Sequence, residues 1–357
     1  MDELAFLHGK PAVSGVFRQQ PEHFAVTEIL TPQGEPQGEH QWLWVEKRGA
    51  NTAWVASQLA AFAGVNERQV SYAGLKDRHA VTRQWYSIQL PGQPLLAWQQ
   101  LEHPEFKVLD ARLQPKKLKS GAHKGNHFSL ELQQISDMPA LLARWQQVVS
   151  QGVPNYFGPQ RFGRQGQNLA KARAWFSGSS RQKLSRTQQG LLLSSARAFL
   201  FNQIASARIA ANRLSIEAGD ALMLSGSHSF FIAEANDATL TSRLEQGDIT
   251  LTAALPGSGR STVSGSVAEF EQQIIAAHAD LVDGLLKHRV DAARRPLLVR
   301  LNDAHLSELD AQRVRLEFSL PSGSFATSVL RELITAPPTE LTATTTGHEI
   351  YDEVISE

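Results

Sequence analysis

Ala73-Gly74-Leu75-Lys76-Asp77-Arg78-His79-Ala80 places one carboxylate between two cations on a turn that begins with glycine. Glycine lets the chain turn where a side chain would clash. The flanking cations favour the ionised form of Asp77 and would attract a substrate that carries several negative charges. An Asp in a turn is most often a cap or a solvated charge, so other features of the chain must decide whether Asp77 has a chemical role.

The segments on both sides of this turn are typical of β-strands. Val70 to Ala73 is a short, mostly apolar segment, and Gln84 to Leu90 places Tyr86, Ile88 and Leu90 on one side. Asp77 is therefore expected in the connection between two strands. Connections that a sheet holds in place are common sites of catalysis.

Further elements are predicted outward from this centre. Strands are expected from Val13 to Ile29 with a break at Pro21, from His127 to Leu132 and from Val314 to Leu320. A helix is predicted with Thr52 as its cap, an apolar face at Val55, Leu59 and Phe62, and Gly64 as its stop. A second helix is expected from about Met138 to Gly152.

The middle of the chain differs from both ends. Phe157 to Gly166 is rich in glycine, aromatic and cationic residues, helical segments follow around Leu169 to Phe176 and Leu191 to Ile209, and Leu222 to Leu255 mixes short elements. This change in composition and in the pattern of predicted elements indicates that the middle of the chain is an insertion into a discontinuous core domain.

We therefore expect an α+β domain formed by residues 1–152 and 301–340. An inserted domain that contains helices and strands is expected at residues 153–300. Residues 341–357 are rich in acidic side chains and are expected to form a mobile tail.

The composition excludes several classes of protein. The 357 residues include no cysteine, which removes disulfide frameworks, thiolate metal sites and cysteine nucleophiles. The chain lacks any uncharged apolar run of about 18 residues, and its start lacks the regions of a secretory signal. We expect a soluble, cytoplasmic protein that has no membrane partner.

Motifs for common cofactors are also missing from the sequence. No lysine-containing phosphate loop and no complete dinucleotide fingerprint occurs. His123 and His127 are four residues apart, but Gly125 and the following strand favour two surface histidines over a metal pair. We therefore expect neither a cofactor nor a metal.

The charge is balanced overall but unevenly distributed. Lys and Arg number 35, as do Asp and Glu, yet no acidic residue lies between Asp137 and Glu217. That acid-free window contains eleven cations: Arg144, Arg161, Arg164, Lys171, Arg173, Arg181, Lys183, Arg186, Arg197, Arg208 and Arg213. A second window runs from Arg112 through Lys116, Lys117, Lys119 and Lys124. Such windows favour a surface for a phosphate backbone; the alternative is solvated helices whose countercharges come from elsewhere in the fold.

Four segments, in this order, resemble motifs of the TruD family of tRNA pseudouridine synthases: Ala73 to Thr82, Lys124 to Phe128, Pro154 to Gly163 and Gly323 to Ser328. They spread over about 250 residues, which makes the set much more specific than any single motif. The resemblance implies a mainly antiparallel, mixed sheet of the pseudouridine synthase type, interrupted by the family's inserted domain. It also implies that the chain isomerises uridine 13 of tRNA without a cofactor, as a monomer without a protein partner.

The resemblance gives roles to individual residues. Asp77 would attack the sugar or the base, or remove a sugar proton, and the sequence does not choose among these. Phe128 would stack on the flipped uracil, a contact of roughly 1–3 kcal/mol. Asn126, two residues earlier on the same strand face, would bind the base edge or hold the loop that carries Asp77.

Other residues are weaker candidates. Substrate contacts are also expected from Phe325, Arg18, Glu22 and Lys76, with Arg18 pairing with Asp77 and Glu22 orienting neighbouring cations. Contacts with the RNA backbone are expected from Arg161, Arg164, Lys116, Lys117, Lys119 and Lys124. The structural alternatives are core packing for Phe128 and Phe325, and an exposed ion pair of under about 1 kcal/mol for Arg18 and Glu22.

One departure from the family pattern concerns a second acid. His23 stands where the family often has Asp, so this chain lacks that acid. Two other classes of function stay open. One is an RNA-binding or RNA-folding protein without catalysis, and the other is a small-molecule hydrolase with Asp77 as its nucleophile.

Overall fold

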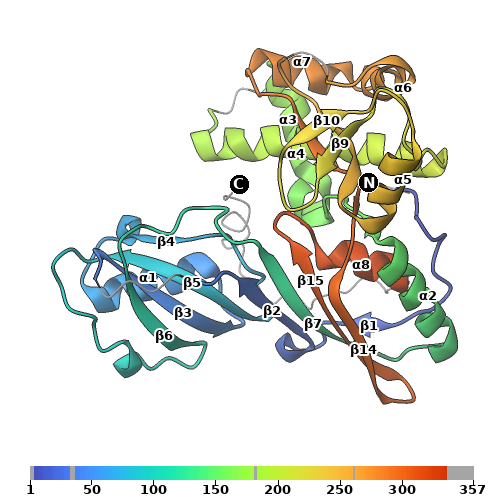
Figure 1. The fold of residues 1–357 in the computed structure, drawn as a ribbon. Helices are drawn as coiled ribbons and strands as arrows, with labels where there is room; N and C mark the ends of the chain where they lie inside the picture. Colours follow the sequence, from blue (N-terminus) through green and yellow to red (C-terminus); the bar gives the residue numbers. More distant parts are fainter. Residues whose placement is uncertain (1–3, 33–36, 181–182, 260–261, 336–357) are drawn as a thin grey trace. The chain divides into compact units, whose positions relative to one another are not determined.

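The computed structural model describes residues 4–32, 37–180, 183–259 and 262–335. The chain forms two compact units (Figure 1). Unit 1 comprises Met1–Ala12, Leu142–Arg300 and Ser324–Leu333, and unit 2 comprises Val13–Leu141, Leu301–Gly323 and Ile334–Glu357. The expected boundaries at 152 and 300 differ from these limits at Met1–Ala12, residues 142–152 and Ser324–Leu333, all of which pack with the middle of the chain. The expected acidic tail, residues 341–357, lies outside the described residues.

Unit 2 is built on one nine-stranded sheet. Its strands are β1 (Val16–Phe17), β2 (Phe24–Ile29), β3 (His40–Arg48), β4 (Val70–Tyr72), β5 (Val81–Gln89), β6 (Phe106–Gln114), β7 (Gly125–Gln133), β14 (Asn302–Asp310) and β15 (Arg313–Pro321). The order is β14-β15-β7-β2-β5-β3-β6, with β1 beside β7 and β4 beside β5. Only β2 and β5 pair in parallel among these described strands. The predicted α+β fold with a mainly antiparallel sheet is thus confirmed.

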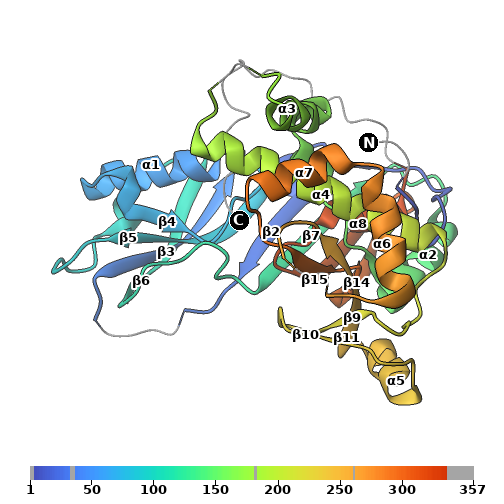
Figure 2. The same cartoon turned by 90° about the horizontal axis from the view of Figure 1, so that it is seen from above.

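Helix α1 (Thr52–Ala63) covers one face of β3 and β5 (Figure 2). A buried cluster joins helix and sheet: Leu43, Val45, Val55, Leu59, Tyr86 and Ile88. Gly64 ends α1 in the left-handed conformation, at φ 66°, which confirms the expected stop. The expected cap is wrong, because Asn51 occupies the N-cap position and Thr52 is the first helical residue. The Thr52 hydroxyl instead accepts a hydrogen bond from the Lys76 amide at 3.0 Å.

Unit 1 combines helices with two small sheets. Its helices are most of α2 (Met138–Gln151), then α3 (Gln167–Phe176), α4 (Arg186–Ala210), α5 (Ala238–Gln246), α6 (Gly265–Ala276), α7 (Ala279–Lys287) and α8 (Ala326–Leu333). Its strands are β8 (Val153–Pro154), β9 (Ala221–Leu224), β10 (Phe230–Ile232), β11 (Ile249–Leu255), β12 (Ala293–Pro296) and β13 (Leu298–Val299). The sheets have the orders β10-β9-β11-β12 and β13-β8, and α4 packs against both β11 and α3.

Short 3-10 helices complete the two units. They are Pro21–His23, Glu67–Gln69, Trp98–Gln100, Pro159–Phe162 and Arg164–Gly166. The last two belong to the glycine-rich segment that follows β8.

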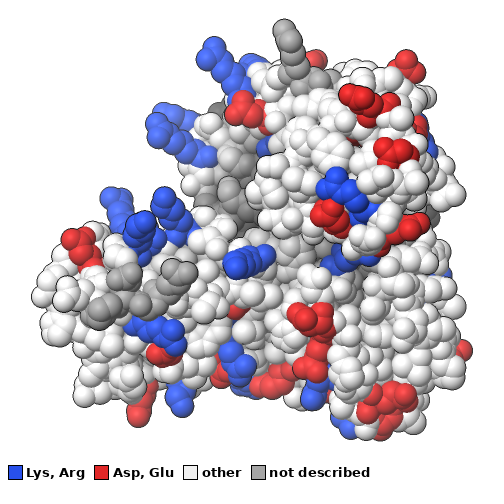
Figure 3. All heavy atoms as spheres, viewed as in Figure 1, with Lys and Arg blue, Asp and Glu red and all other residues white. Residues whose placement is uncertain are grey.

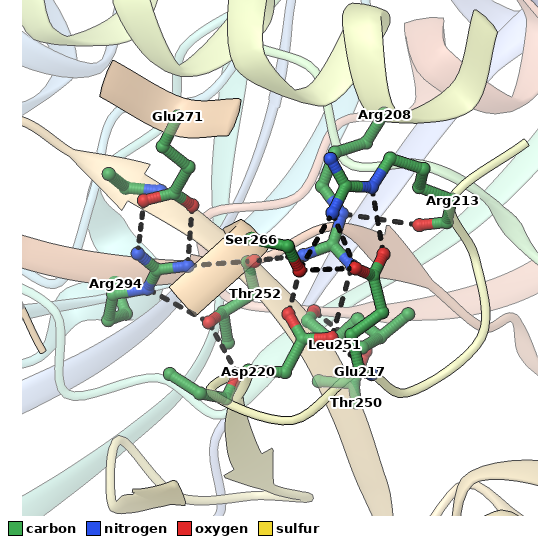
Figure 4. Close-up of polar contacts among 12 residues, drawn as sticks. Arg208, Arg213, Glu217, Asp220, Thr250, Leu251, Thr252, Ser266, Glu271 and Arg294 are labelled. Carbon is green, nitrogen blue, oxygen red and sulfur yellow. Dashed lines mark hydrogen bonds and ion pairs between the residues drawn. The ribbon is translucent and has the colours of Figure 1, made fainter. Parts of the chain in front are cut away.

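A buried ionic network crosses unit 1 (Figure 4). Arg294 donates to both carboxylate oxygens of Glu271 at 2.7 Å, and the two side chains are 4% and 5% exposed. Arg208 pairs with Asp220 at 2.7 Å, also in the interior. At the partly exposed edge of this network, a hydrogen bond from Arg213 lowers the pKa of Glu217 to about 2. Because buried charges are costly unless paired, these acids and cations depend on each other.

Removing one partner of the buried Arg294 and Glu271 pair is expected to destabilise the protein strongly. Arg294→Met leaves a buried carboxylate without its cation, so the free energy of unfolding should fall by about 3–5 kcal/mol. The double variant Arg294→Met, Glu271→Leu should be more stable than the single variant, because no charge stays unpaired. Urea denaturation measures both; a single variant as stable as wild type would contradict this account.

Candidate active site

The residues between β4 and β5, here called the Asp77 loop (residues 73–80), connect two neighbouring strands as expected. Three buried side chains hold this loop. Gln84 Nε2 donates to the Gly74 carbonyl at 2.9 Å, Thr52 accepts from the Lys76 amide, and Lys47 Nζ donates to the Asp77 carbonyl at 2.8 Å. All three holding residues are at most 2% exposed. The backbone beside Asp77 is therefore fixed from the sheet and from the start of α1.

Arg18 fixes the side chain of Asp77. Its Nη2 donates to Asp77 Oδ2 at 2.7 Å, so the expected pairing is present. The two side chains are 14% and 30% exposed, which leaves the carboxylate accessible. The guanidinium carbon of Arg18 lies 3.5 Å from the centroid of the Phe24 ring, and Arg18 adopts a positive φ of 59°. A cation over a ring and an unusual backbone together indicate a side chain with a prescribed direction.

The sheet register places Phe128 in the same row across the sheet as Lys47, the side chain that holds the Asp77 loop. Lys47 on β3 is opposite Thr82 on β5, Thr82 is opposite Val26 on β2, and Val26 is opposite Phe128 on β7. Residues directly opposite each other share a face of the sheet, so this row lies under the Asp77 loop. Phe318 extends the row on β15.

Phe128 is more buried than a stacking platform needs to be. Its residue exposure is 6%, and its ring lies 6.4 Å from that of Phe24 and 5.5 Å from that of Phe318, measured between centroids. This packing resembles the core role that the sequence left open. The same aromatic cluster supports Arg18 through Phe24.

Lys76, expected to attract the substrate and to contact it, is buried and not exposed to it. Its Nζ pairs with Glu28 at 3.1 Å, and the two side chains are 5% and 0% exposed. Glu28 also accepts from the Trp85 amide at 3.1 Å. The reason is long-range: a buried carboxylate on β2 attracts the lysine inward.

Asn126 lies beside this pair. The register sets it opposite Glu28, two residues before Phe128 on β7. Its Oδ1 is buried and has no hydrogen-bond partner within the ranges of the chain that the structure describes. Buried polar atoms are nearly always paired, so an unpaired acceptor at this place suits a ligand donor.

Glu22 and His23 lie at the edge of the site. Glu22 forms an ion pair with Arg48, and the hydrogen bond from Arg48 lowers the pKa of Glu22. His23 Nε2 lies 3.2 Å from Gln133 Nε2. In the loop itself, burial and then the nearby Arg78 and other cations lower the pKa of His79, which favours a neutral ring.

A lysine-rich segment adjoins the Asp77 loop. We call residues 115–124 the lysine loop; Lys116, Lys117, Lys119 and Lys124 are all exposed in it. Leu118 is 1% exposed and packs with Trp42, Trp85 and Ala73. The Gly121 amide donates to the Ala73 carbonyl at 2.7 Å. Figure 3 shows cations gathered along this edge of unit 2, near β4 and the β6–β7 connection.

Two other candidates, Phe325 and Arg161, lie in unit 1 around Phe157. The Phe157 centroid lies 6.2 Å from that of Phe325 and 5.5 Å from the guanidinium carbon of Arg161. Arg295, which the sequence did not single out, lies closer, at 4.0 Å, and binds the Asn155 side chain at 2.7 Å. The side chain of Arg164 is outside the described part of the structure.

The acid-free window is less cationic in three dimensions than in sequence. Arg208 pairs with Asp220, Arg213 with Glu217 and Arg173 with Asp280, and all three acids lie beyond the window. For these cations the countercharge alternative is correct, because Glu217 and Asp220 follow directly at the end of the window and Asp280 comes from a distant segment.

Two general properties can be stated for the described residues. None of their helices is long and apolar enough to cross a membrane. They also contain no group of three or more His, Asp or Glu side chains that could hold a metal ion.

Two lysines near the site differ in burial, so replacing them should change the free energy of unfolding by very different amounts. Lys76→Met leaves Glu28 buried without its cation and should lower the free energy of unfolding by about 3–5 kcal/mol. Lys117→Met removes an exposed side chain and should change it by less than about 0.5 kcal/mol. Urea denaturation of both variants tests this; equally small changes would mean that Lys76 is solvated.

Comparison with known proteins gives a consistent result. The family model described as tRNA pseudouridine synthase D (TruD) matches residues 1–174 and 167–333. The tRNA pseudouridine synthase D of Aeromonas salmonicida is 46% identical over 337 residues, which are 94% of this chain and 95% of that protein. The protein of the same name from Idiomarina loihiensis is 45% identical over 336 residues, 93% of this chain and 95% of its own length.

A solved structure supports the fold. A crystal structure from Methanosarcina mazei that is described as a TruD protein matches with a TM-score of 0.70 and 22% identity. The match covers 92% of this chain and 95% of that one. The resemblance inferred from four sequence motifs, and with it the expected enzyme class, an isomerase, is confirmed. The chain belongs to the TruD family of tRNA pseudouridine synthases.

Proposed function

We propose that this protein converts uridine 13 of tRNA to pseudouridine, with Asp77 as the reacting carboxylate and without a cofactor. In this isomerisation the N1–C1′ bond breaks, the base turns, and a C5–C1′ bond forms. The proton lost from C5 is balanced by the proton gained at N1, so no oxidant, reductant or second substrate is needed. A single carboxylate in a shaped pocket is enough for such a reaction.

The observation that carries this proposal is the Arg18 and Asp77 contact at 2.7 Å on a carboxylate that stays 30% exposed. Arg18 donates a hydrogen bond to Asp77 Oδ2 and so fixes the direction of the carboxylate, which matters for each of its possible roles. These roles are attack on the sugar, attack on the base, and removal of a sugar proton. Fixed geometry also matters, because reacting atoms must come within about 3.5 Å of each other.

The neighbouring side chains suit a flipped uracil. The buried, unpaired Oδ1 of Asn126 can accept a hydrogen bond from the N3–H of uracil, whereas N3 of cytosine carries no hydrogen. Phe128 lies two residues further along the same face of β7 and can offer its edge or a face after a small rearrangement. We assign Asn126 to base recognition and Phe128 to the apolar wall of the pocket.

The lysine loop supplies a backbone contact next to the pocket. Lys116, Lys117 and Lys119 point outward from a segment that Leu118 anchors and that bonds to Ala73, the first residue of the Asp77 loop. Exposed lysines neutralise phosphates and release counterions. We assign these lysines to the tRNA backbone near the target nucleotide, and Arg161 and Phe325 to RNA contacts from unit 1.

Replacing the Asp77 carboxylate should stop the reaction and leave RNA binding intact. Asp77→Asn keeps the shape but lacks the charge, so pseudouridine formation on unmodified tRNA transcripts should fall below detection while the Kd for tRNA stays within about threefold. Mapping pseudouridine nucleotide by nucleotide also tests position 13.

Asp110→Asn is a matched control for that variant. Asp110 pairs with Arg112 at 2.7 Å and is 38% exposed, so the substitution removes a similar carboxylate and ion pair on β6. It should keep wild-type activity. Normal product yield with Asp77→Asn would remove Asp77 from the reaction, and tRNA binding without any turnover by the wild type would favour a non-catalytic RNA-binding protein.

Asn126→Ala should weaken recognition of the base. Loss of the buried acceptor should cost about 1–3 kcal/mol of transition-state stabilisation. Because each 1.4 kcal/mol is a factor of about ten, kcat/KM should fall accordingly. Ser129→Ala, on the other face of the same strand, is the control and should be silent. Steady-state kinetics on a tRNA transcript gives the comparison; equal effects of the two substitutions would exclude Asn126 from base recognition.

A further inference from the structure

Lys47 is a buried cation that the motifs of the chain did not point to. Its residue exposure is 1%, and its Nζ donates to three main-chain carbonyls: those of Ala50 at 2.7 Å, Asp77 at 2.8 Å and Lys76 at 3.3 Å. An ammonium group has three donors, so these carbonyls match its hydrogen-bonding capacity.

Core packing does not explain a lysine at this position. Val45, two residues earlier on the same face of β3, is fully buried in the apolar cluster under α1. An apolar residue at position 47 would extend that cluster, whereas burying an ammonium group is costly unless it is well paired. The buried cation therefore needs a reason other than stability of the core.

Two of the three acceptors bracket the reacting residue. The carbonyl of Lys76 precedes the Asp77 Cα and the carbonyl of Asp77 follows it. Because peptide groups are planar, fixing both carbonyls fixes φ and ψ of Asp77 and thus the direction of its Cα–Cβ bond. Arg18 holds the other end of the side chain at Oδ2.

We propose that Lys47 is a positioning residue for the reaction: it pins the main chain on both sides of Asp77, so that the carboxylate meets the flipped nucleotide in one orientation. The inference rests on the proposed function of Asp77. Lys47 itself touches no substrate, because its ammonium group is buried beneath the loop. Its effect must therefore act on the chemical step and leave tRNA binding unchanged.

The expected size of the effect follows from geometry. A displacement of about 1 Å at a reacting group costs about 100-fold in rate. Lys47→Met retains most of the length of the side chain but donates no hydrogen bond, so kcat should fall by about 100-fold with an unchanged Kd for tRNA. Lys47→Gln retains an N–H donor and should lie between Met and wild type.

The test compares four full-length proteins: wild type, Lys47→Met, Lys47→Gln and Val45→Ala. Val45→Ala is the matched control, because it weakens the same layer of the core without touching the Asp77 loop. Near-UV circular dichroism identifies the temperature at which each protein is folded. Single-turnover pseudouridine formation at saturating protein then gives the rate of the chemical step, and filter binding gives the Kd for a tRNA transcript.

We expect the rate of the chemical step to decrease from wild type to Lys47→Gln to Lys47→Met. Val45→Ala should be within about twofold of wild type, and all four proteins should have the same Kd for tRNA. If Lys47→Met does not fold, the folded Gln variant alone must still be slower than Val45→Ala. Folded Lys47 variants as fast as Val45→Ala, or a loss that appears in Kd alone, would overturn the positioning role. An inactive wild type would instead overturn the proposed function itself.

Discussion

A carboxylate that reacts must be reachable and must point in one direction, and the Arg18 and Asp77 contact meets both needs. The guanidinium is itself held by the Phe24 ring 3.5 Å away. From below, Lys47 holds the main chain of the same residue. The Phe24 ring, buried Lys47 and the positive φ of Arg18 all bear on this one constraint, the direction of the Asp77 side chain.

On one face of the sheet, some rows of side chains stabilise the core and the neighbouring row supports the reacting loop. Val45 and Leu43 pack against α1, while Lys47, one row further along β3, supports the loop. A sheet is well suited to this division, because its register fixes the position of each side chain to within a fraction of the strand spacing. Register and packing can therefore make the site rigid.

Features set by local chemistry were predictable from the sequence. The connection that carries Asp77, the stop of α1 at Gly64 and the extent of β7 depend on turn residues and on period-two alternation, which neighbouring residues determine. The family could be inferred because its four motifs keep their order across most of the chain. The pairing of Arg18 with Asp77, 59 residues apart, came from that resemblance and not from periodicity.

Features set by distant partners were not predictable. Lys76 is buried because it pairs with Glu28, which is 48 residues away in the sequence and lies on a neighbouring strand. The Thr52 hydroxyl accepts a hydrogen bond from the Lys76 amide and does not cap α1. Lys47 gave no signal, since it lies in the charged run Glu46-Lys47-Arg48 at the end of β3, a pattern typical of a solvated strand end. The most direct measurement is a crystal structure of the Asp77→Asn protein with a tRNA transcript. The account predicts the target uridine turned out of the RNA, with its C1′ or base within about 4 Å of the residue 77 side chain and its edge at Asn126; a target uridine bound away from residue 77 would contradict it.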